Sequence, residues 1–408
     1  MTHDHGRGQR SDKRSSWHQA LLWALAHAVN DGYPTLYLAV LPVLMHRWHF
    51  TVGQAGLLAG LLALTTQALQ PVFGWWADQR GGPWFIVGGL LAGSLGNAIG
   101  LAWAPSYAAF AVALMVGGLG NAAFHPHMAA LVTQTDQTRK GRQMSGWMVS
   151  GMIGHALAPI AAVAAWNWGG QLGMAILAVP GLLAAGSLYK SARSLKRPNL
   201  LKDKPLPIVW RQAWRRARPF LGVVVLRNLG SASLLTLLPI LWHIRGGALN
   251  DSGLLLAAVY SAGMVGNLLG GALSDHWGSR VVLIGSLFLA GIAAVAWGVI
   301  PGTGWTFWIA VAAWGFSVNG AGAVILVYGQ GLFPGRSGMA SGLTMGLGNT
   351  VGAFGAWVIG SLAQSHGMAP AVTVAAGCLW LGLIPIFLMR SSSDGPRDSH
   401  RRRKNSKS

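Results

Sequence analysis

The segment Gly271-Ala-Leu-Ser-Asp275-His-Trp-Gly278-Ser-Arg280 has a counterpart 197 residues upstream, Gly74-Trp-Trp-Ala-Asp78-Gln-Arg-Gly81-Gly-Pro83. Both segments place glycines around an aspartate at the same spacing, and only the upstream segment lacks the final arginine. The same offset aligns Leu41-Pro-Val-Leu-Met-His46 with Leu238-Pro-Ile-Leu-Trp-His243 without a gap. Agreement of separate stretches at one offset predicts an internal duplication of the chain.

Apolar runs surround these segments along most of the chain. A helix needs roughly 20 apolar residues, at about 1.5 Å of rise per residue, to cross a bilayer. We therefore predict an all-α membrane protein with twelve transmembrane helices in two pseudo-symmetric bundles of six. The predicted spans lie near 18–45, 52–76, 83–104, 106–133, 144–166, 169–189, 219–244, 252–274, 280–300, 305–331, 338–364 and 369–389.

The composition excludes an ordinary soluble protein. Only 10% of the residues are charged, against roughly 25% in soluble domains. Hydrophobic residues make up 52% of the chain, and its mean hydropathy is +0.44. A soluble fold of this composition would have too few polar side chains to cover its surface.

The longest polar interruption predicts the domain organisation. Residues 190–218 are predicted to form a basic linker between a first bundle at 18–189 and a second at 219–389. Basic tails are predicted at 1–17 and 390–408. Parallel repeats imply two bundles related by an axis along the membrane normal, with a site at their interface.

The positive charges predict the orientation in the membrane. If both termini are cytoplasmic, 27 of the 30 Lys and Arg residues lie in cytoplasmic segments, which fits the positive-inside rule. Arg47 and Arg245 then lie on the outer side, and Arg227 lies within a span. Binding of anionic lipid headgroups at the cytoplasmic face is an expected secondary effect of this charge.

Several classes of function are excluded or disfavoured. All ten acidic residues are aspartates, which excludes the H-E-x-x-H helix of metalloproteases. No Ser–His signature or pair of carboxylates marks a catalytic centre, so an intramembrane enzyme is a weak alternative and no cofactor is expected. Cys378, the single cysteine, can form no disulfide within the chain. Basic runs such as 401–404 lack interleaved aromatics, so no nucleic-acid partner is expected.

The duplicated segment resembles the G-x-x-x-D-x-x-G-x-R signature of the major facilitator superfamily. A closer resemblance, to the fosmidomycin-resistance group of that superfamily, rests on His27-Ala-Val-Asn30-Asp31, Gln70-Pro71 and Ala123-Phe-His125-Pro126. It implies a proton-driven exporter of the bacterial inner membrane, which binds a small molecule and protons. Where that group usually carries glutamate after the His-Pro pair, this chain has His127.

Two charged residues are predicted inside spans, Asp31 and Arg227. Such residues normally face a cavity, because a charge at mid-span costs about 2.5–3.5 kcal/mol on insertion scales. At the repeat offset Asn228 is the counterpart of Asp31, so a pair of Asp31 with Arg227 across the repeat axis is one expectation. Such a pair would either line the transport path or merely hold helices together.

Polar side chains near these two charges form the predicted site. Asn30 and Asp31 follow His27 at i+3 and i+4, and two tyrosines flank this stripe. Asn121 and His125 share a face of span four, while tryptophans are assigned to packing and interface anchoring. The predicted substrate-binding residues are His27, Asn30, Tyr33, Tyr37, Gln70, Asn121, His125, Arg227, Asn228 and Asn319, and the predicted proton-coupling residues are Asp31, His125 and His127.

The predicted site favours an anion. Arg227 and up to four histidines face one aspartate, and guanidinium offers forked donors to phosphonate or carboxylate. The competing hypothesis is a divalent metal-ion transporter that uses His27, Asp31, His125 and His127. A fixed Arg227 argues against it because it repels cations.

The resemblance also implies gates on the cytoplasmic side. Asp78 is expected to reach the start of span eleven near Arg336, and Asp275 the start of span five near Arg142. A helix N-terminus favours an anion at such a contact. The predicted gating residues are Gly74, Asp78, Arg142, Gly271, Asp275, Gly278, Arg280 and Arg336, and the protein is expected to be a monomer.

Overall fold

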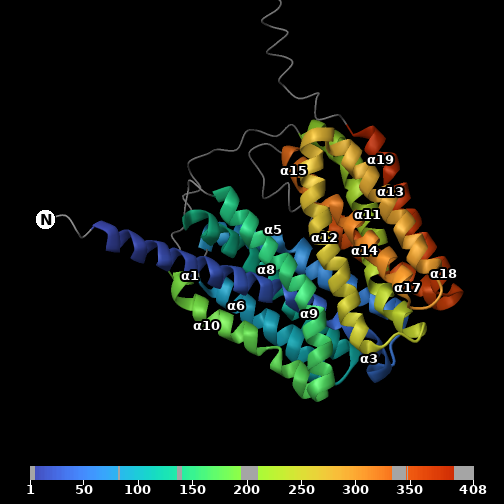
Figure 1. Cartoon of the computed structure of the whole chain (residues 1–408), viewed down its shortest axis with the longest axis horizontal. Helices are drawn as coiled ribbons and strands as arrows, with labels where there is room; N and C mark the ends of the chain where they lie inside the picture. The colour runs from blue at the N-terminus through green and yellow to red at the C-terminus, as the bar shows by residue number, and fades with distance from the viewer. Residues whose placement is uncertain are drawn as a thin grey trace, which may run out of the picture.

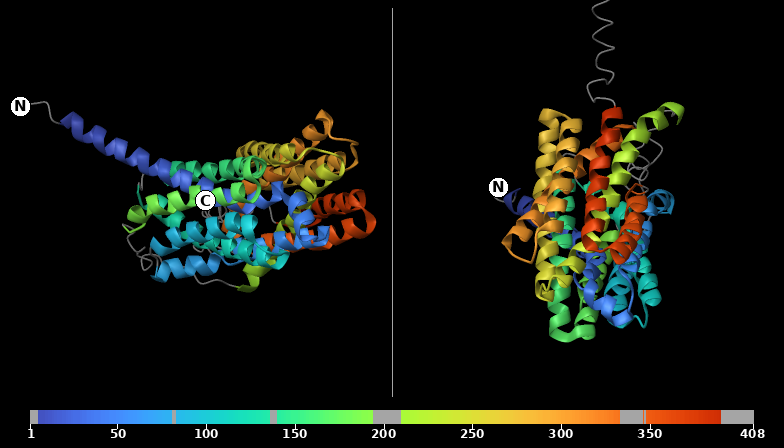
Figure 2. Two further views of the ribbon diagram at one scale, coloured as in Figure 1. Left: turned by 90° about the horizontal axis from the view of Figure 1, so that it is seen from below. Right: turned by 90° about the vertical axis from the view of Figure 1, so that its right-hand side faces the viewer.

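The computed structural model describes residues 5–80, 83–135, 140–193, 210–332, 346 and 348–389. Within these ranges every regular element is a helix, and nine segments are long and apolar enough to cross a membrane. The predicted all-α membrane fold is confirmed. Figures 1 and 2 show the two halves of the chain as helical bundles that lie side by side.

The first half is described from His5 to Arg193. Several spans are interrupted by short segments of 3-10 or π-helix, labelled η. The elements in chain order are α1 (His5–Gly32), η1 (Tyr33–Thr35), α2 (Leu36–Ala39), α3 (Leu41–Trp48), α4 (Val52–Ala63), η2 (Leu64–Ala68), α5 (Gln70–Arg80), α6 (Pro83–Ser94), η3 (Leu95–Ile99), α7 (Gly100–Trp103), α8 (Tyr107–Thr135), α9 (Lys140–Ile176) and α10 (Val179–Arg193).

The second half is described from Trp210 onward and is built in the same way. Its spans are mostly long single helices, and among those that the structure describes there are breaks at Ala321 and at Gly382. The elements are α11 (Trp210–Ile244), α12 (Leu249–Trp277), α13 (Ser279–Val299), α14 (Trp305–Gly320), α15 (Gly322–Leu332), α17 (Gly348–His366), α18 (Met368–Leu381) and α19 (Leu383–Leu388).

The helices account for the predicted spans with some differences at their ends. Helix α9 reverses direction at Gly169 and Gly170, where the backbone leaves helical geometry and Gly173 packs back onto the Ala165 carbonyl. The predicted span 18–45 corresponds to α1 to α3. The predicted span 338–364 corresponds to α17, although residues before Gly348 fall largely outside the described ranges. The count of twelve spans stays a prediction.

The predicted domain boundaries fall partly within helices. Helix α1 begins at His5, so the predicted tail 1–17 is largely an extension of the first helix, which projects from the bundle in Figure 1. Helix α10 ends at Arg193 and α11 begins at Trp210, so both ends of the predicted linker 190–218 are helical. Residues 194–209 and 390–408 lie outside the described residues.

The halves meet through two equivalent helix pairs. Helix α4 packs on α17, and α12 packs on α9, as expected for a duplicated chain. The backbones approach very closely: a Cβ on Gly56 would overlap the Ala356 carbonyl, and a Cβ on Gly253 would lie 2.7 Å from the Pro159 carbonyl oxygen. Close packing of this kind requires small residues at both crossings.

These contacts lie at one end of the molecule. Helices α4 and α12 each follow one completed span, so their first turns lie at the end opposite the N-terminus and the linker. Asn167 also donates a hydrogen bond to Asn250 across the halves at this end, with 2.5 Å between Nδ2 and Oδ1. The two halves are therefore closed together at the end remote from the termini.

Arg47 and Arg245, the two basic residues predicted on the outer side, have equivalent structural roles. Arg47 Nη1 donates to the carbonyls of Leu101 and Ala102 at 3.2 and 3.1 Å, where a helix ends. Arg245 donates to the carbonyls of Trp297 and Gly298 at 3.0 and 2.5 Å, at the end of α13. The last carbonyls of a helix lack partners and carry partial negative charge, so each arginine stabilises a helix end at this surface.

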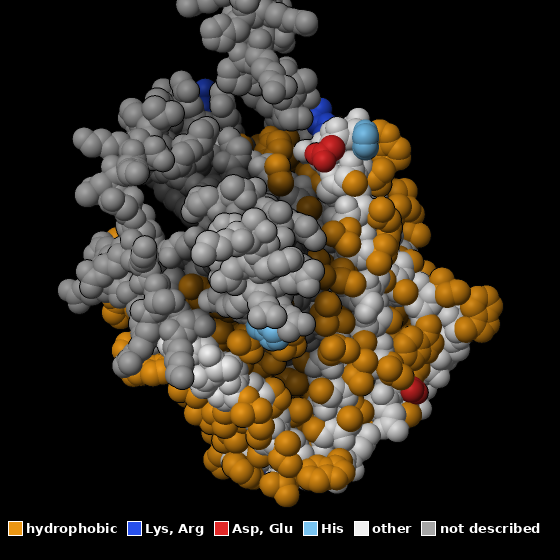
Figure 3. All heavy atoms as spheres, turned by 60° about the vertical axis from the view of Figure 1, so that its left-hand side comes forward, with side chains coloured by type: hydrophobic (Ala, Val, Ile, Leu, Met, Phe, Trp, Pro, Cys, Tyr) orange, Lys and Arg blue, Asp and Glu red, His pale blue; other side chains and the backbone are white. Residues whose placement is uncertain are grey.

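The outer surface of the bundle is apolar. Large side chains such as Leu183, Val358 and Ile384 are more than half exposed. Figure 3 shows one face covered mainly by hydrophobic side chains, with few charged ones in view. A surface of this kind is suited to contact with lipid chains.

Candidate functional site

Asp31 is the only buried acidic residue among those whose side chains the structure describes, and it lies where the first span is interrupted. Helix α1 ends at Gly32, and η1 follows with Pro34, which lacks an N–H donor. The hydroxyl of Thr35 donates to the Gly32 carbonyl at 2.8 Å. This interruption places the Asp31 carboxylate in the last turn of α1, with only 8% of the residue exposed.

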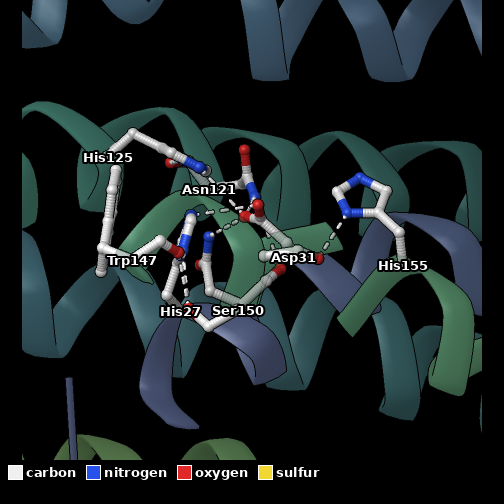
Figure 4. A network of polar contacts seen from close by, with 9 residues as sticks. His27, Asp31, Asn121, His125, Trp147, Ser150 and His155 are labelled. Carbon is white, nitrogen blue, oxygen red and sulfur yellow. Dashed lines mark hydrogen bonds and ion pairs between the residues drawn. The ribbon is translucent and has the colours of Figure 1, made fainter. Parts of the chain in front are cut away.

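Two imidazoles from different helices converge on this carboxylate, as Figure 4 shows. Nε2 of His27 lies 3.1 Å from Oδ2 of Asp31, one turn along α1. Nε2 of His125, on α8, lies 3.0 Å from Oδ1. The predicted association of these three residues is therefore present in the structure.

The other ring nitrogen of each histidine determines its tautomer. Nδ1 of His27 lies 2.6 Å from the Trp147 carbonyl oxygen, and Nδ1 of His125 lies 2.9 Å from that of Asn121. Carbonyl oxygens only accept hydrogen bonds, so each Nδ1 must carry a proton. A neutral ring with its proton on Nδ1 has a lone pair on Nε2. That lone pair would face a carboxylate oxygen of Asp31 and would be repelled by it.

Each contact between an Nε2 atom and the Asp31 carboxylate therefore requires one proton in addition to those on the two Nδ1 atoms. The carboxyl group can hold only one of the two, so at least one of His27 and His125 is an imidazolium. With both contacts made, the three side chains together carry a net charge of +1. Loss of one proton leaves one nitrogen lone pair facing a carboxylate oxygen, and that contact must open.

Neutral groups complete the surroundings of the carboxylate. The side-chain amides of Asn30 and Asn121 donate to Oδ1 at 3.2 and 3.5 Å. Gly151 on α9 makes room for the cluster, because a Cβ there would overlap Oδ2 of Asp31 and lie 2.6 Å from Cε1 of His27. Ser150, which donates to the Trp147 carbonyl at 2.6 Å, supports the same segment of α9.

Arg227 forms a separate network in the second half. Its Nε and Nη2 donate to the Val318 carbonyl at 3.1 and 2.8 Å, and its Nη1 donates to Oδ1 of Asn228 at 3.1 Å. Asn228 in turn donates to Asn349 on α17. Val318 lies in the last turn of α14, where helix carbonyls lack intrahelical partners, so the arginine binds at a helix break.

The expected pair of Asp31 with Arg227 is not formed in this structure. The partners of Asp31 are the two histidines, and no carboxylate of the described residues lies within ion-pair distance of the guanidinium. Each charge finds polar partners within its own half, so neither needs the other. Arg227 therefore keeps a positive charge that only neutral groups of the described chain contact.

Two predicted residues lie away from this network. The hydroxyl of Tyr33 donates to the Leu177 carbonyl and accepts from the Gly181 amide, both at 2.9 Å, and so stabilises the junction of α9 and α10. His127 stacks on Phe85, with ring centroids 4.2 Å apart, and bonds to the Ala123 carbonyl. Its place on α8 explains the separation, because residues two positions apart point in different directions on a helix.

Three other predicted polar residues, Tyr37, Asn319 and Gln70, lie in different surroundings. Tyr37 is buried near Phe110, and the amide of Asn319 donates to the carbonyl of Gly315 in its own helix. Gln70, the first residue of α5, is partly buried. None of the three contacts the Asp31 carboxylate in this structure.

The predicted gate of the second repeat is described in part. Asp275 is exposed at the end of α12, and Gly278 has a φ of 83°, a conformation that favours glycine. Arg280 donates to the carbonyls of Phe387 and Met389, and so binds the end of α19. This contact holds the last span against α13, a structural role that the gate prediction did not include.

Gly74 and Gly271, the first glycines of the two duplicated segments, are less crowded than the neighbouring Gly270. A Cβ on Gly74 or Gly271 would meet only side chains at ordinary distances, whereas one on Gly270 would overlap the Gly320 carbonyl. The gate contacts expected for the side chains of Asp78, Arg142 and Arg336 lie outside the described residues.

Some residues of the site are not marked in the sequence, and others are marked only by their polarity within a span. The ring of Trp147 stacks on His27 with centroids 3.7 Å apart, although the sequence indicates only a packing tryptophan. His155, one turn beyond Gly151, contacts Tyr260 of the other half at 5.4 Å between rings. Asn349, which its polarity within a span marks as a candidate to complete the second half of the site, accepts a hydrogen bond from Asn228.

The donor atoms of His27, Asp31 and His125 all lie within 4.8 Å of one another. Two imidazoles and a carboxylate at this spacing are suited either to sharing protons or to binding a first-row metal ion. Both chemistries use the same atoms, so they exclude each other at a given moment.

Comparison with known proteins agrees with this architecture. The sequence model of the Major Facilitator Superfamily matches residues 23–356. The chain is 28% identical over 382 residues to YfnC, an uncharacterised MFS-type transporter of Bacillus subtilis (strain 168), covering 90% of this chain and 92% of the relative. It is 29% identical over 382 residues to the fosmidomycin resistance protein of Escherichia coli (strain K12), covering 90% and 91%.

Solved structures show the same fold. A bacterial homologue of the human lysosomal transporter Spinster, in an inward-facing and occupied conformation, matches with a TM-score of 0.77 at 16% identity, covering 91% of this chain and 96% of that one. The nucleoside transporter NupG matches with a TM-score of 0.76 at 11% identity, covering 91% and 99%. With the family model matching most of its length, this chain belongs to the Major Facilitator Superfamily, and it is a multi-pass membrane transporter rather than an enzyme.

Proposed function

We propose that this transporter moves a small organic anion across the membrane in a process coupled to protons. The observation that carries the proposal is the division of charge between the halves. The first half holds a buried carboxylate between two imidazoles, and the second holds a partly buried arginine without an acidic partner among the described residues. Such charges within a membrane span normally contact water and a solute.

Arg227 supports the choice of an anion. Three of its five N–H groups are bound to Val318 and Asn228, which fixes the plane of the guanidinium and leaves two for a ligand. A planar or tetrahedral group with two oxygens, such as a carboxylate or phosphonate, matches such a pair of donors. The name of the Escherichia coli relative, a fosmidomycin resistance protein, supports a phosphonate as the first compound to test.

The effect of a bound proton on the affinity for the anion provides the coupling. An anion at Arg227 is attracted by the net positive charge of the histidine cluster, and release of a proton weakens that attraction. Rocking of the two halves about the site then exposes it to each side in turn. In this reading the closed end, near Gly56 and Gly253, is periplasmic and the site opens toward the cytoplasm.

We infer that the protein lies in a bacterial inner membrane with both termini in the cytoplasm, because 27 of 30 basic residues then lie on that side. A cysteine placed at Ser408 and one placed at Gly246, in separate chains with Cys378 replaced, would test this. Labelling by an impermeant thiol reagent added to intact cells is expected at position 246 and not at 408.

Transport in proteoliposomes tests the function. Wild-type protein is expected to move a phosphonate or organic acid uphill when a pH gradient is imposed. Asp31→Asn, which leaves no carboxylate for the imidazoles, is expected to reduce gradient-driven transport at least tenfold. Asp251→Asn, at the start of α12 and far along the chain from the site, is the matched control and is expected to retain activity.

Two outcomes would contradict the proposal. Undiminished uphill transport by Asp31→Asn would show that the buried carboxylate does not couple protons. Transport of Mn²⁺ or Zn²⁺, with no organic anion moved, would favour the metal-ion alternative, which the close spacing of His27, Asp31 and His125 supports.

A further inference from the structure

We propose that His155 and Tyr260 form a further part of the substrate site, which binds a hydroxyl group on the anion that Arg227 holds. The inference rests on the proposed function and deepens it, because it names a second chemical group that the substrate carries. The two side chains come from different halves of the molecule and meet where the halves are in contact.

The pair lies between the buried carboxylate and the closed end of the molecule. On α9, His155 lies one turn beyond the glycine that packs on Asp31 (Figure 4). One turn farther along α9, Pro159 packs on Gly253 of α12 at the closed end. Tyr260 follows Gly253 by two turns of α12, so both lie on the same face of that helix. The rings of His155 and Tyr260 meet with their centroids 5.4 Å apart.

Each side chain has one polar atom without a hydrogen-bond partner among the described residues. Nδ1 of His155 lies 2.9 Å from the Gly151 carbonyl oxygen, so in the neutral ring Nδ1 carries the proton and Nε2 is an acceptor. The hydroxyl of Tyr260 has no partner in the same part of the chain. Neither atom is sealed in the interior, in contrast to the unpartnered Nε2 of His127. An acceptor and a hydroxyl are therefore open to a ligand.

The equivalent place where α4 packs on α17 has its polar groups paired. At the repeat offset of 197 residues, Ala63 is the counterpart of Tyr260. The hydroxyl of Thr350 lies within hydrogen-bond distance of the carbonyls of Ala63, in the other half, and Gly346, at 3.1 and 2.7 Å. A hydrogen bond between the halves thus occupies this place. The described contact at Tyr260 is one between rings, which leaves their polar atoms unused.

The pair lies within reach of a small molecule bound at Arg227. Helices α11 and α12 pack together and are joined by a short loop between Ile244 and Leu249. At about 1.5 Å of rise per residue, Arg227 lies about 25 Å from this loop along α11, and Tyr260 about 16 Å along α12. Their depths therefore differ by about 9 Å. A chain of about three or four carbons, with a hydrogen bond of about 3 Å at each end, covers this difference.

The two free atoms select a hydroxyl group at the far end of such a chain. A ligand hydroxyl can donate to Nε2 of His155 and accept from the hydroxyl of Tyr260, so one group satisfies both atoms. An anion without this group leaves both protein atoms unpaired when it excludes water from them. Sites of this kind reject the analogue that lacks the hydroxyl, because unpaired polar groups within a complex are costly.

Binding of matched anions to purified protein, measured by titration calorimetry, tests the inference without measuring transport. One pair of probes is 3-hydroxypropylphosphonate and propylphosphonate, and the other is 4-hydroxybutyrate and butyrate. The members of each pair differ by one hydroxyl group. Wild-type protein is expected to bind the hydroxylated member at least about tenfold more tightly in the pair whose anionic group it accepts.

Tyr260→Phe keeps the ring and removes only the hydroxyl, and His155→Phe replaces the acceptor with an apolar ring. Each is expected to reduce the preference for the hydroxylated anion at least about threefold, with little change in affinity for the anion that lacks it. A merely structural role would weaken both anions equally. Tyr107→Phe is the matched control, because the Tyr107 hydroxyl donates to the Gln54 carbonyl at 3.0 Å, and it is expected to keep the full preference.

The outcomes separate this inference from the proposed function. A preference that survives unchanged in both Tyr260→Phe and His155→Phe would overturn the role of the pair. Equal binding of both members of a pair by wild-type protein, with uphill transport of either, would overturn it and leave the proposed function standing. If the hydroxylated anion binds preferentially but a pH gradient does not drive its transport in proteoliposomes, the proposed coupling fails and the assignment of His155 and Tyr260 stands.

Discussion

A Cβ on Gly151 would lie 2.6 Å from Cε1 of His27 and would overlap Oδ2 of Asp31. At the scale of single residues, this glycine is as necessary to the cluster as the charged groups, because helix α9 can approach the carboxylate only without a side chain there. The same crowding helps to bury His27 and Asp31, which are 3% and 8% exposed.

Gly151→Ala tests this dependence without changing any charge. The added methyl group must displace the carboxylate or the His27 ring, and overpacking of this kind costs about 1–3 kcal/mol. We expect gradient-driven transport to fall at least tenfold, with the protein still inserted and folded. Gly186→Ala, where nothing lies within 4 Å of the new Cβ, is the control and is expected to transport normally. Equal activity of both variants would contradict the importance of the close approach.

At the scale of elements, interruptions of helices place the functional groups. Asp31 lies at the end of α1 before η1, and Arg227 binds Val318 where α14 ends before α15. Asn267 supports the second break, because its Oδ1 accepts from the Ala323 amide at 2.7 Å, just after the break. Irregular backbone within a membrane is tolerated where it is buried in protein or lines a cavity.

The sequence predicts some of this arrangement and not the rest. His27, Asp31 and His125 could be predicted because helical spacing and a family-like motif mark them. The stack of Trp147 on His27 could not, since it joins positions 120 residues apart and tryptophan is common in spans. The expected pair of Asp31 with Arg227 failed because local partners, which no repeat offset reveals, satisfy both charges.

The crossing of α4 with α17 is a second element whose geometry can be tested. Gly56 packs directly on the Ala356 carbonyl, so Gly56→Ala is expected to hold the halves apart at the closed end. Impaired closure should reduce transport by about tenfold while leaving the His27 cluster intact. Gly88→Ala is the control, because nothing lies within 4 Å of its Cβ. Proteoliposome transport measures the effect, and a fully active Gly56→Ala would show that this contact is dispensable.

At the scale of the whole molecule, the duplicated halves explain how one fold can open to either side of the membrane. Equivalent pairs, α4 with α17 and α9 with α12, form the closed end. The charged networks lie one in each half, with Asp31 and its histidines on one side and Arg227 on the other. A movement of one half against the other therefore changes the distance between the networks while leaving the hydrogen bonds within each half intact.

A reversible cross-link tests whether the closed end must open during transport. Asn167 and Asn250 are already in contact across the halves, so cysteines at both positions are expected to form a disulfide on oxidation. Cys378, the single native cysteine, is first replaced by serine to remove other thiols. The oxidised double variant is expected to lose transport, because a molecule locked at this end can face only one side.

Reduction separates this block from damage to the fold. Adding a thiol reductant is expected to restore transport to the level of the unoxidised double variant, and each single cysteine variant should be insensitive to oxidation. A cross-linked protein that still carried solute uphill would require a path that bypasses this end of the bundle, and alternation of the two halves about Asp31 and Arg227 would then be wrong.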